Sequence, residues 1–222
     1  RTNEAKRSRA TNLSAARFPV VVLISGRGTN LQTIVDEVRA GKLPIDIRAV
    51  ISNNPEAAGL KQAHAAGLHI EVVDHRAHPT RADFDQALIA AIDAHAPKLV
   101  ALAGFMRILG RDFIEHYRGR LINIHPSLLP KYPGLGTHTR AIAAGETQHG
   151  ASVHFVTPDV DAGPVILQAS VPVLPDDTTE TLAERVLQEE HRIYPRAIRW
   201  FAEGRLVLRD GRALLDGKPC PE

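Results

Sequence analysis

The amino-acid sequence predicts an α/β protein with a doubly wound, mostly parallel open sheet. Short, continuous apolar runs alternate along the chain with segments in which apolar residues recur every three or four positions. A glycine-rich turn directly follows the first apolar run. Repeated strand–helix units of this length indicate parallel strands joined by right-handed crossovers, because parallel neighbours need a long connection.

The first half of the chain supplies the parallel strands. Residues 18–24 form a continuous apolar run, which is typical of a strand buried on both faces. A segment with apolar residues at helical spacing follows and stops at Gly41. The same alternation predicts strands at 45–51, 69–73 and 98–103 and helices at 55–66 and 81–94.

The second half changes character. A short segment at 111–117 leads to a brief strand at 121–123. The strand-like runs 151–156 and 165–173 are separated by only a short loop, so we expect them to add antiparallel strands to one side of the sheet.

The chain then continues with a long helical pattern at 178–201. Pro195 lies inside this pattern and predicts a kink or a break, because proline cannot donate the helical hydrogen bond. Asp210-Gly211 between two apolar runs predicts a C-terminal hairpin.

Composition and charge limit the possible functions. The chain has 222 residues with 27 Lys and Arg against 25 Asp and Glu, but residues 1–18 hold five of the basic residues and one of the acidic ones. The remainder therefore carries 22 basic and 24 acidic residues, and the pI of about 8.9 is no argument for a nucleic-acid partner. We expect residues 1–18 to be a disordered extension and residues 19–222 to form a single domain.

The sequence contains no run approaching the roughly 18 apolar residues that a membrane span needs. Its single cysteine, Cys220, excludes an intramolecular disulfide and a cysteine-built metal site, which fits a cytoplasmic protein. His75 and His78 share an H-x-x-H spacing without nearby Cys or Glu partners, so no metal is expected there.

The glycine-rich turn, "SGRGTN" at residues 25–30, is a candidate anion site. Backbone N–H groups and the positive end of a helix dipole converge where a strand turns into a helix. Leu31 stands where a dinucleotide fingerprint has its third glycine, so a monophosphate is the better ligand. The alternative is a tight turn whose glycines only relieve steric strain.

A polar constellation follows the strand at 121–123. Asn123 and His125 lie in "NIHPSLLP", which opens an irregular loop, and Asp159 and Asp161 lie in the loop "TPDVDAGP". A carboxylate near His125 would favour a protonated imidazole, and an Asn amide could donate to a developing oxyanion. Singly, each residue is more often structural. Together they predict attack on an acyl carbon, and the absence of a G-x-S-x-G motif argues against an acyl-enzyme.

Five motifs in order closely resemble the phosphoribosylglycinamide formyltransferase family of purine synthesis, over about residues 20–215. They are "VVLISGRGTNLQ", "ALAGFMRIL", "LINIHPSLLPKYPG", "GASVHFVTPDVDAGPVILQ" and "QEEHRIYPRAIRWFAEGRL". The resemblance implies a Rossmann-like formyltransferase fold with a nucleotide-binding half, about 19–120, and a folate-binding catalytic half, about 121–222. It also implies formyl transfer from 10-formyltetrahydrofolate, as cosubstrate, to the amine of glycinamide ribonucleotide.

The resemblance assigns roles by matching positions. His125 would donate a proton, Asp161 would keep it protonated, and Asn123 would bind the formyl oxygen. The matching nucleotide residues are Gly28, Thr29, Asn30 and Glu190. The matching folate residues are Arg81, Met106, Arg107, Ile108, Leu109, Asn123, Thr157, Pro158, Asp159, Val160 and Asp161.

Some alternatives remain open at this stage. Ser152 and His154 could support the site or belong to the core, and Gly136 replaces a histidine frequent in close relatives, which puts loop order and substrate affinity in doubt. Formyltetrahydrofolate deformylase and methionyl-tRNA formyltransferase share the motif but are expected to need further domains. A non-catalytic phosphometabolite-binding module is the rival of a different class, and a monomer and a homodimer fit equally well.

Overall fold

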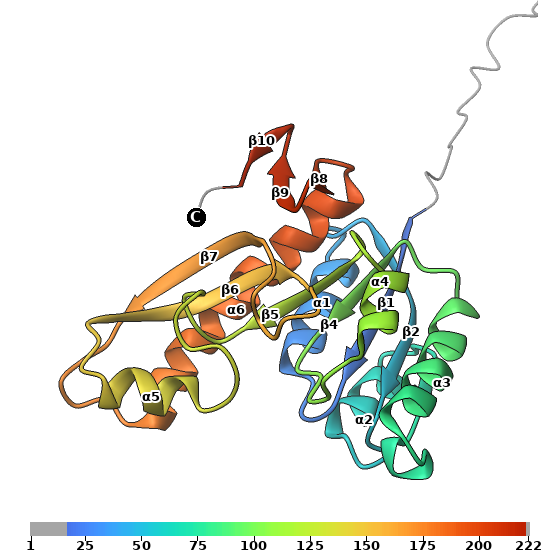
Figure 1. Cartoon of the computed structure of the whole chain (residues 1–222), viewed down its shortest axis with the longest axis horizontal. Coiled ribbons are helices and arrows are strands. Elements are labelled where there is room, and N and C mark those ends of the chain that lie inside the picture. The colour runs from blue at the N-terminus through green and yellow to red at the C-terminus, as the bar shows by residue number, and fades with distance from the viewer. Residues whose placement is uncertain (1–16, 221–222) are drawn as a thin grey trace, which may run out of the picture.

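The computed structural model describes residues 17–220, and a seven-stranded sheet with helices on both faces forms its centre (Figure 1). The strand order is β3-β2-β1-β4-β5-β6-β7, with β1 to β5 parallel and β6 and β7 antiparallel to their neighbours. The strands are β1 Phe18–Ile24, β2 Ile45–Ser52, β3 Ile70–Val72, β4 Leu99–Leu102, β5 Leu121–His125, β6 Gln148–Phe155 and β7 Val165–Pro172. The predicted doubly wound sheet with antiparallel additions is confirmed.

Helices on the two faces enclose two apolar cores. The larger core lies between the sheet and α1, α2 and α6, and the smaller one lies under α3 and α4. The helices are α1 Thr29–Arg39, α2 Ala58–Ala65, α3 Arg81–Asp93, α4 Arg111–His116, α5 Thr137–Ala143 and α6 Thr179–Ala202, with the 3-10 turn η1 at His75–Ala77. The predicted C-terminal hairpin is present in a separate sheet of β8 Leu206–Arg209, β9 Arg212–Leu215 and β10 Lys218–Pro219.

The chain reverses its direction of winding between β1 and β4. The strands β1, β2 and β3 run outward on one side, and β4 and β5 continue on the other. The carboxyl ends of parallel strands at such a switch point leave a crevice between the connections, which is where open α/β sheets bind ligands. A pocket of about 1050 Å³ lies at this position.

The structure corrects three predictions of local structure. The helix expected from residue 55 begins only at Ala58, because Pro55 and Glu56 still form a turn and Ala57 is the residue that caps the helix. The irregular loop after β5 contains an unpredicted helix, α5. Of the kink or break predicted at Pro195, the break is wrong: α6 continues through this residue, and the completely buried Tyr194 and Ala197 hold the helix on the sheet.

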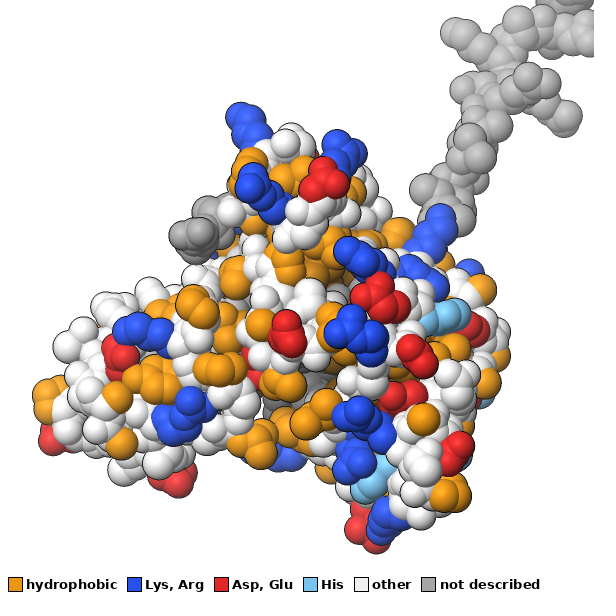
Figure 2. Space-filling model, in the orientation of Figure 1, with side chains coloured by type: hydrophobic (Ala, Val, Ile, Leu, Met, Phe, Trp, Pro, Cys, Tyr) orange, Lys and Arg blue, Asp and Glu red, His pale blue; other side chains and the backbone are white. Residues whose placement is uncertain are grey.

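The predicted extension at residues 1–18 falls almost entirely outside the described residues. Within residues 17–220, acidic and basic side chains lie interspersed on the face shown in Figure 2. Among these residues there is no helix with both the length and the apolar character to cross a membrane.

Candidate active site

The glycine-rich turn joins β1 to α1 at the switch point. Gly28 adopts a left-handed conformation with φ +75° directly before the first residue of α1. A Cβ atom at this position would lie 2.7 Å from the Cα atom of Gly59 in α2, so the turn needs glycine for its conformation and for its close packing. Backbone packing thus determines the shape of the predicted phosphate site.

Asn30 and Glu190 meet beside this turn, although 160 positions separate them. The Asn30 Nδ2 group donates a hydrogen bond of 2.8 Å to Glu190 Oε2, and both side chains are buried. Burial raises the pKa of the Glu190 carboxyl group. The Asn30 Oδ1 atom is also buried and has no hydrogen-bond partner among residues 17–220. This contact attaches the middle of α6 to the glycine-rich side of the pocket.

Asn123 and His125 lie at the end of β5, and their alternation along the strand places both side chains on one face. The His125 Nε2–H group donates a hydrogen bond of 2.9 Å to the Tyr132 carbonyl oxygen. This bond leaves Nδ1 as the ring atom available for a second partner. Tyr132 itself has φ +54°, an uncommon conformation for a non-glycine residue.

Asp161 supplies that second partner. Its Oδ2 atom lies 3.5 Å from His125 Nδ1 and accepts a hydrogen bond of 2.8 Å from the Gly134 N–H group. Asp161 also has positive φ, at +50°, and left-handed non-glycine residues cluster at functional sites. The structure therefore brings the predicted imidazole and carboxylate together from segments 36 positions apart.

His154 completes this group of side chains. Its Nδ1–H donates a hydrogen bond of 2.9 Å to the Phe155 carbonyl oxygen, which leaves Nε2 as an acceptor for Asn123 Nδ2 at 3.2 Å. Burial lowers the pKa of His154 and keeps it neutral, as this acceptor role requires. Antiparallel pairing of β5 with β6 sets Asn123 opposite His154. His154 thus fixes which end of the Asn123 carboxamide is the donor.

Ser152 supports the proline-containing loop after β5 and makes no side-chain hydrogen bond to Asn123, His125 or Asp161. Its hydroxyl donates to the Ser127 carbonyl oxygen at 2.7 Å and accepts the Leu129 N–H at 3.0 Å. The Gln168 amide also donates to the Ser152 hydroxyl oxygen, at 2.8 Å. These bonds hold the segment after His125 against β6 and β7.

Apart from Arg81 on α3 and Asn123 on β5, the predicted folate residues lie on two loops with mostly exposed side chains. Met106, Ile108 and Val160 are 67%, 63% and 53% exposed, whereas Leu109 is buried. Met106 and Arg107 line the large pocket together with Gly28, Thr29, Asn30 and Glu190. Arg81, the first residue of α3, lies near Gly110 at the far end of the same loop. Thr157, Pro158 and Asp159 precede Asp161 in the second loop.

Sequence reasoning missed a chain of contacts that joins the two sides of the pocket. The Ser25 hydroxyl donates to Asn53 Oδ1 at 2.5 Å and accepts the Met106 N–H at 2.7 Å. His75 Nδ1–H in turn donates to the Asn53 carbonyl oxygen at 3.0 Å. The available signal was the polar "SNN" at the end of β2, because parallel strands present their carboxyl ends at one edge.

Sequence reasoning also missed a pair of histidines: His149 is buried, and His138 is half-buried and lines the large pocket. His138 Nδ1 and His149 Nε2 are 3.2 Å apart. Burial lowers the pKa of His149 to about 4 and also lowers that of His138. Gly136, with φ +66°, caps the start of α5 just before His138.

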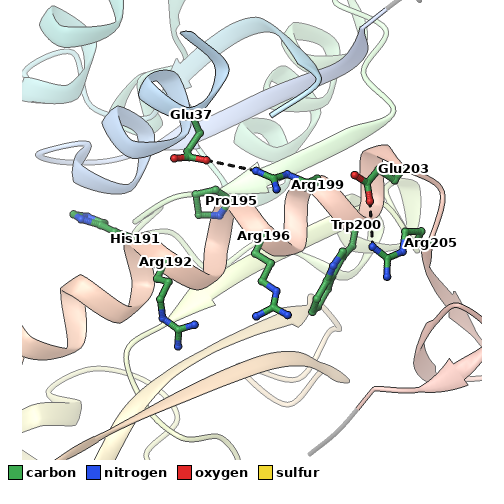
Figure 3. Close-up of a pocket in the computed structure, with 9 residues that line it drawn as sticks. All are labelled: Glu37, His191, Arg192, Pro195, Arg196, Arg199, Trp200, Glu203 and Arg205. Atoms are coloured by element: carbon green, nitrogen blue, oxygen red, sulfur yellow. Dashed lines mark hydrogen bonds and ion pairs between the residues drawn. The ribbon is translucent and has the colours of Figure 1, made fainter. Parts of the chain in front are cut away.

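A second, smaller pocket of about 480 Å³ lies along the last turns of α6 (Figure 3). Three of its arginines are paired with carboxylates, and Arg196 lies over the Trp200 ring at 4.9 Å. The paired arginines are Arg192, Arg199 and Arg205. The charges of this second pocket are therefore largely compensated.

Comparisons with known proteins agree with this geometry. Residues 18–198 match the model of the family described as formyl transferase. Phosphoribosylglycinamide formyltransferase of Escherichia coli strain K12 is 52% identical over 91% of this chain and 95% of its own length. The solved structure of phosphoribosylglycinamide formyltransferase from Coxiella burnetii, in complex with CHES, is 56% identical with a TM-score of 0.89, and the match covers 91% of this chain and 95% of that one.

A formyltetrahydrofolate deformylase structure from Pseudomonas syringae pv. tomato is also similar, at 26% identity with a TM-score of 0.84. That match covers 90% of this chain and only 66% of the deformylase. The family model spans most of the residues that form the sheet, the glycine-rich turn and the loop of Asp161. The chain belongs to the formyl transferase family.

Proposed function

We propose that this protein transfers a formyl group from 10-formyltetrahydrofolate to the amine of glycinamide ribonucleotide, in the cytoplasm and without a metal. The single observation that carries the proposal is the position of Asp161 beside His125 Nδ1, at the end of the strand that also presents Asn123. A binding module would have no need of a carboxylate, an imidazole and a carboxamide held together in this way.

The proposed reaction is a direct transfer. The substrate amine attacks the formyl carbon, and the oxygen that gains charge accepts an N–H from Asn123. Asn123 can offer this hydrogen because its amide nitrogen carries two, and His154 accepts only one of them. The orientation that His154 imposes on the carboxamide therefore supports the oxyanion role.

Collapse of the intermediate breaks the bond between the formyl carbon and the folate nitrogen. The leaving nitrogen needs a proton, which His125 supplies from Nδ1, because Nε2–H is held at the Tyr132 carbonyl. The Asp161 carboxylate lies 3.5 Å from Nδ1, where it can orient the ring and balance positive charge on the imidazole while the proton moves. The attacking amine loses one proton, which replaces the proton that His125 gives to the folate nitrogen, so the transfer consumes and releases no net proton.

The two substrates reach this centre from opposite sides, the nucleotide from the glycine-rich turn and the folate from the loops at 106–109 and 157–161. The phosphate binds at the turn of Gly28, Thr29 and Asn30, with Glu190 toward the amine end. The flat pterin binds between the loop at 106–109 and the loop at 157–161, where apolar side chains and backbone groups can contact its faces and edges.

An assay of formyl loss from 10-formyltetrahydrofolate tests the proposal directly. The rate is measured by the appearance of tetrahydrofolate, with and without glycinamide ribonucleotide. Formyl loss that depends on glycinamide ribonucleotide, with formylated product in equal amount, is the expected result. Equal loss without the nucleotide would identify a deformylase, and no loss under either condition would identify a binding protein.

A further inference from the structure

Three side chains that can bind metals converge at the edge of the sheet, on elements that carry none of the proposed catalytic residues. They are His69, directly before β3, Glu71 within β3, and His95, just after α3. Their ligand atoms all lie within 4.8 Å of one another. We propose that His69, Glu71 and His95 form a binding site for Zn²⁺.

The contacts already direct both imidazoles at one carboxylate oxygen. Glu71 Oε1 lies 2.9 Å from His69 Nε2 and 2.5 Å from His95 Nε2. The two rings lie side by side, with centroids 5.1 Å apart. A zinc ion with bonds of about 2.0–2.1 Å holds its ligand atoms about 3.3 Å apart, so each of the two distances from Glu71 Oε1 to an imidazole nitrogen needs to lengthen by less than about 1 Å. The two imidazole nitrogens already lie within 4.8 Å of each other.

The backbone holds these residues in place before any metal binds. His69 and Glu71 alternate along a strand, so their side chains project from one face, and β3 pairs with β2 at Glu71 opposite Ile51. The Val50 N–H also donates to the His69 carbonyl oxygen at 2.9 Å. His95 is fixed by its own N–H bond of 3.0 Å to the Ile92 carbonyl. Only side-chain rotamers need to change.

The ligand set and its exposure suit zinc. Two imidazoles and one carboxylate are a common three-ligand set for Zn²⁺, with a fourth position open to water. The His95 side chain is 18% exposed, Glu71 30% and His69 56%, so the site is accessible from solvent without being fully hydrated.

One cation lies close to the cluster, but its charge is compensated. The Arg48 guanidinium donates to the His95 carbonyl oxygen at 3.2 Å, and Asp46 Oδ2 lies 3.2 Å from Arg48 Nε. A bound zinc ion would join the three-residue edge strand β3 to the C-terminal end of α3. The expected role is structural, since the cluster shares no residue with the proposed active site.

Zinc titration calorimetry on the tag-free, chelator-treated full chain tests this proposal. We expect the wild type to bind one more equivalent of Zn²⁺ than His95→Phe, which keeps an aromatic ring and removes a ligand. Glu71→Gln keeps the side-chain shape and should weaken that binding event at least tenfold. Zinc bound at other histidines is common to all three proteins and cancels in the comparison.

His116→Phe is the matched control. His116 Nε2 lies 2.8 Å from Asp93 Oδ2, an exposed imidazole–carboxylate pair without a second imidazole among the described residues. This variant should bind zinc as the wild type does. With zinc 100-fold above its dissociation constant, the melting temperature should rise by about 5–10 °C in the wild type and His116→Phe only.

Unchanged turnover and circular dichroism in the variants will show that each is folded. If His95→Phe and Glu71→Gln bind zinc with the stoichiometry and affinity of the wild type, the proposal is wrong. The cluster is then two imidazoles hydrogen-bonded to one carboxylate and nothing more.

Discussion

The glycine-rich turn and the His125 centre lie at the same edge of the sheet, but they are built in different ways. The turn is made of consecutive backbone groups, and its shape depends on the conformation and packing of Gly28. The centre is made of side chains from β5, β6 and the Asp161 loop, held by hydrogen bonds to carbonyl groups of Tyr132 and Phe155.

Because of this difference, substitutions in the turn should affect substrate binding, and substitutions in the centre should affect the chemical step. A backbone-built site can be damaged only by changing its shape, which should alter affinity first. A side-chain site can lose one functional atom while its shape remains, which should alter turnover first. Substitutions in the two regions should therefore give different kinetic signatures, and four predictions test this comparison.

The largest effect is expected from Asp161→Asn. The amide preserves the shape of the loop and removes the charge 3.5 Å from His125 Nδ1, so kcat should fall by about 10²–10⁴-fold. Nucleotide binding, measured by calorimetry, should stay nearly unchanged. Turnover like that of the wild type would rule out the proposed role of the carboxylate.

The second prediction concerns the dependence of stability on pH. It applies to His149 on β6, the strand that also carries His154 of the side-chain centre. Burial holds the pKa of His149 at about 4 in the folded protein, below the ordinary value of about 6.5, so the unfolded chain binds the extra proton between these values. The stabilising contribution is complete above pH 6.5 and is lost as the pH falls toward 4. Urea unfolding should show a loss of about 2 kcal/mol from this group between pH 7.5 and 5.

His149→Gln should flatten this pH dependence, because the titrating group is gone. A pH dependence identical to that of the wild type would mean that other groups account for the acid sensitivity.

Gly28→Ala should weaken nucleotide binding about tenfold, measured as KM, with a smaller change for the folate. Its Cβ would meet the Gly59 Cα atom at 2.7 Å in a left-handed conformation. Gly41→Ala is the control, because Gly41 has a similar φ of +70° and open space around it. Gly41→Ala should reduce stability without affecting KM. Equal losses for both substrates in Gly28→Ala would instead indicate a folding defect.

Ser25→Ala should give the smallest effect, and it tests the link between the two sides of the pocket. Without the hydroxyl, the Met106 N–H loses its acceptor, so KM for the folate should rise about threefold to fivefold while kcat changes little. Ser52→Ala, which removes a hydroxyl bonded only within its own turn to Asn54, is the control. Identical kinetics in Ser25→Ala and the wild type would show that Ser25 does not position the loop at 106–109 for the folate.

The parts of the fold that were predictable are those that depend on local patterns. The continuous apolar run of β1 and the glycines after it determine a strand and a turn within a dozen residues. The polar residues at the end of β5 could also be assigned to the ligand-binding edge, because parallel strands end there. The family resemblance, and not the pattern, singled out Asp161 rather than Asp159.

The parts that were missed depend on contacts between distant segments. Helix α5 has only seven residues, and its start at Gly136 has no side-chain cap. The role of His154 depends on the pairing register that sets it opposite Asn123. The apolar pattern of a single strand does not reveal which residue of the neighbouring strand it pairs with. The Ser25 link similarly needs the ends of β1, β2 and β4 to be placed side by side.

Tyr194 has a consequence for the size of the substrate that the proposed active site can accept. Its buried hydroxyl donates to the Leu102 carbonyl oxygen at 2.7 Å, and Glu190 lies one helical turn earlier, bonded to Asn30. Helix α6 is thereby bonded to β4 and to α1 at once, and both bonds oppose a shift of Glu190 relative to the end of β5. We therefore expect the distance from the glycine-rich turn to Asn123 to stay nearly constant. That distance should select substrates by the separation of their phosphate group and their amine. One extra methylene should cost about tenfold or more in kcat/KM.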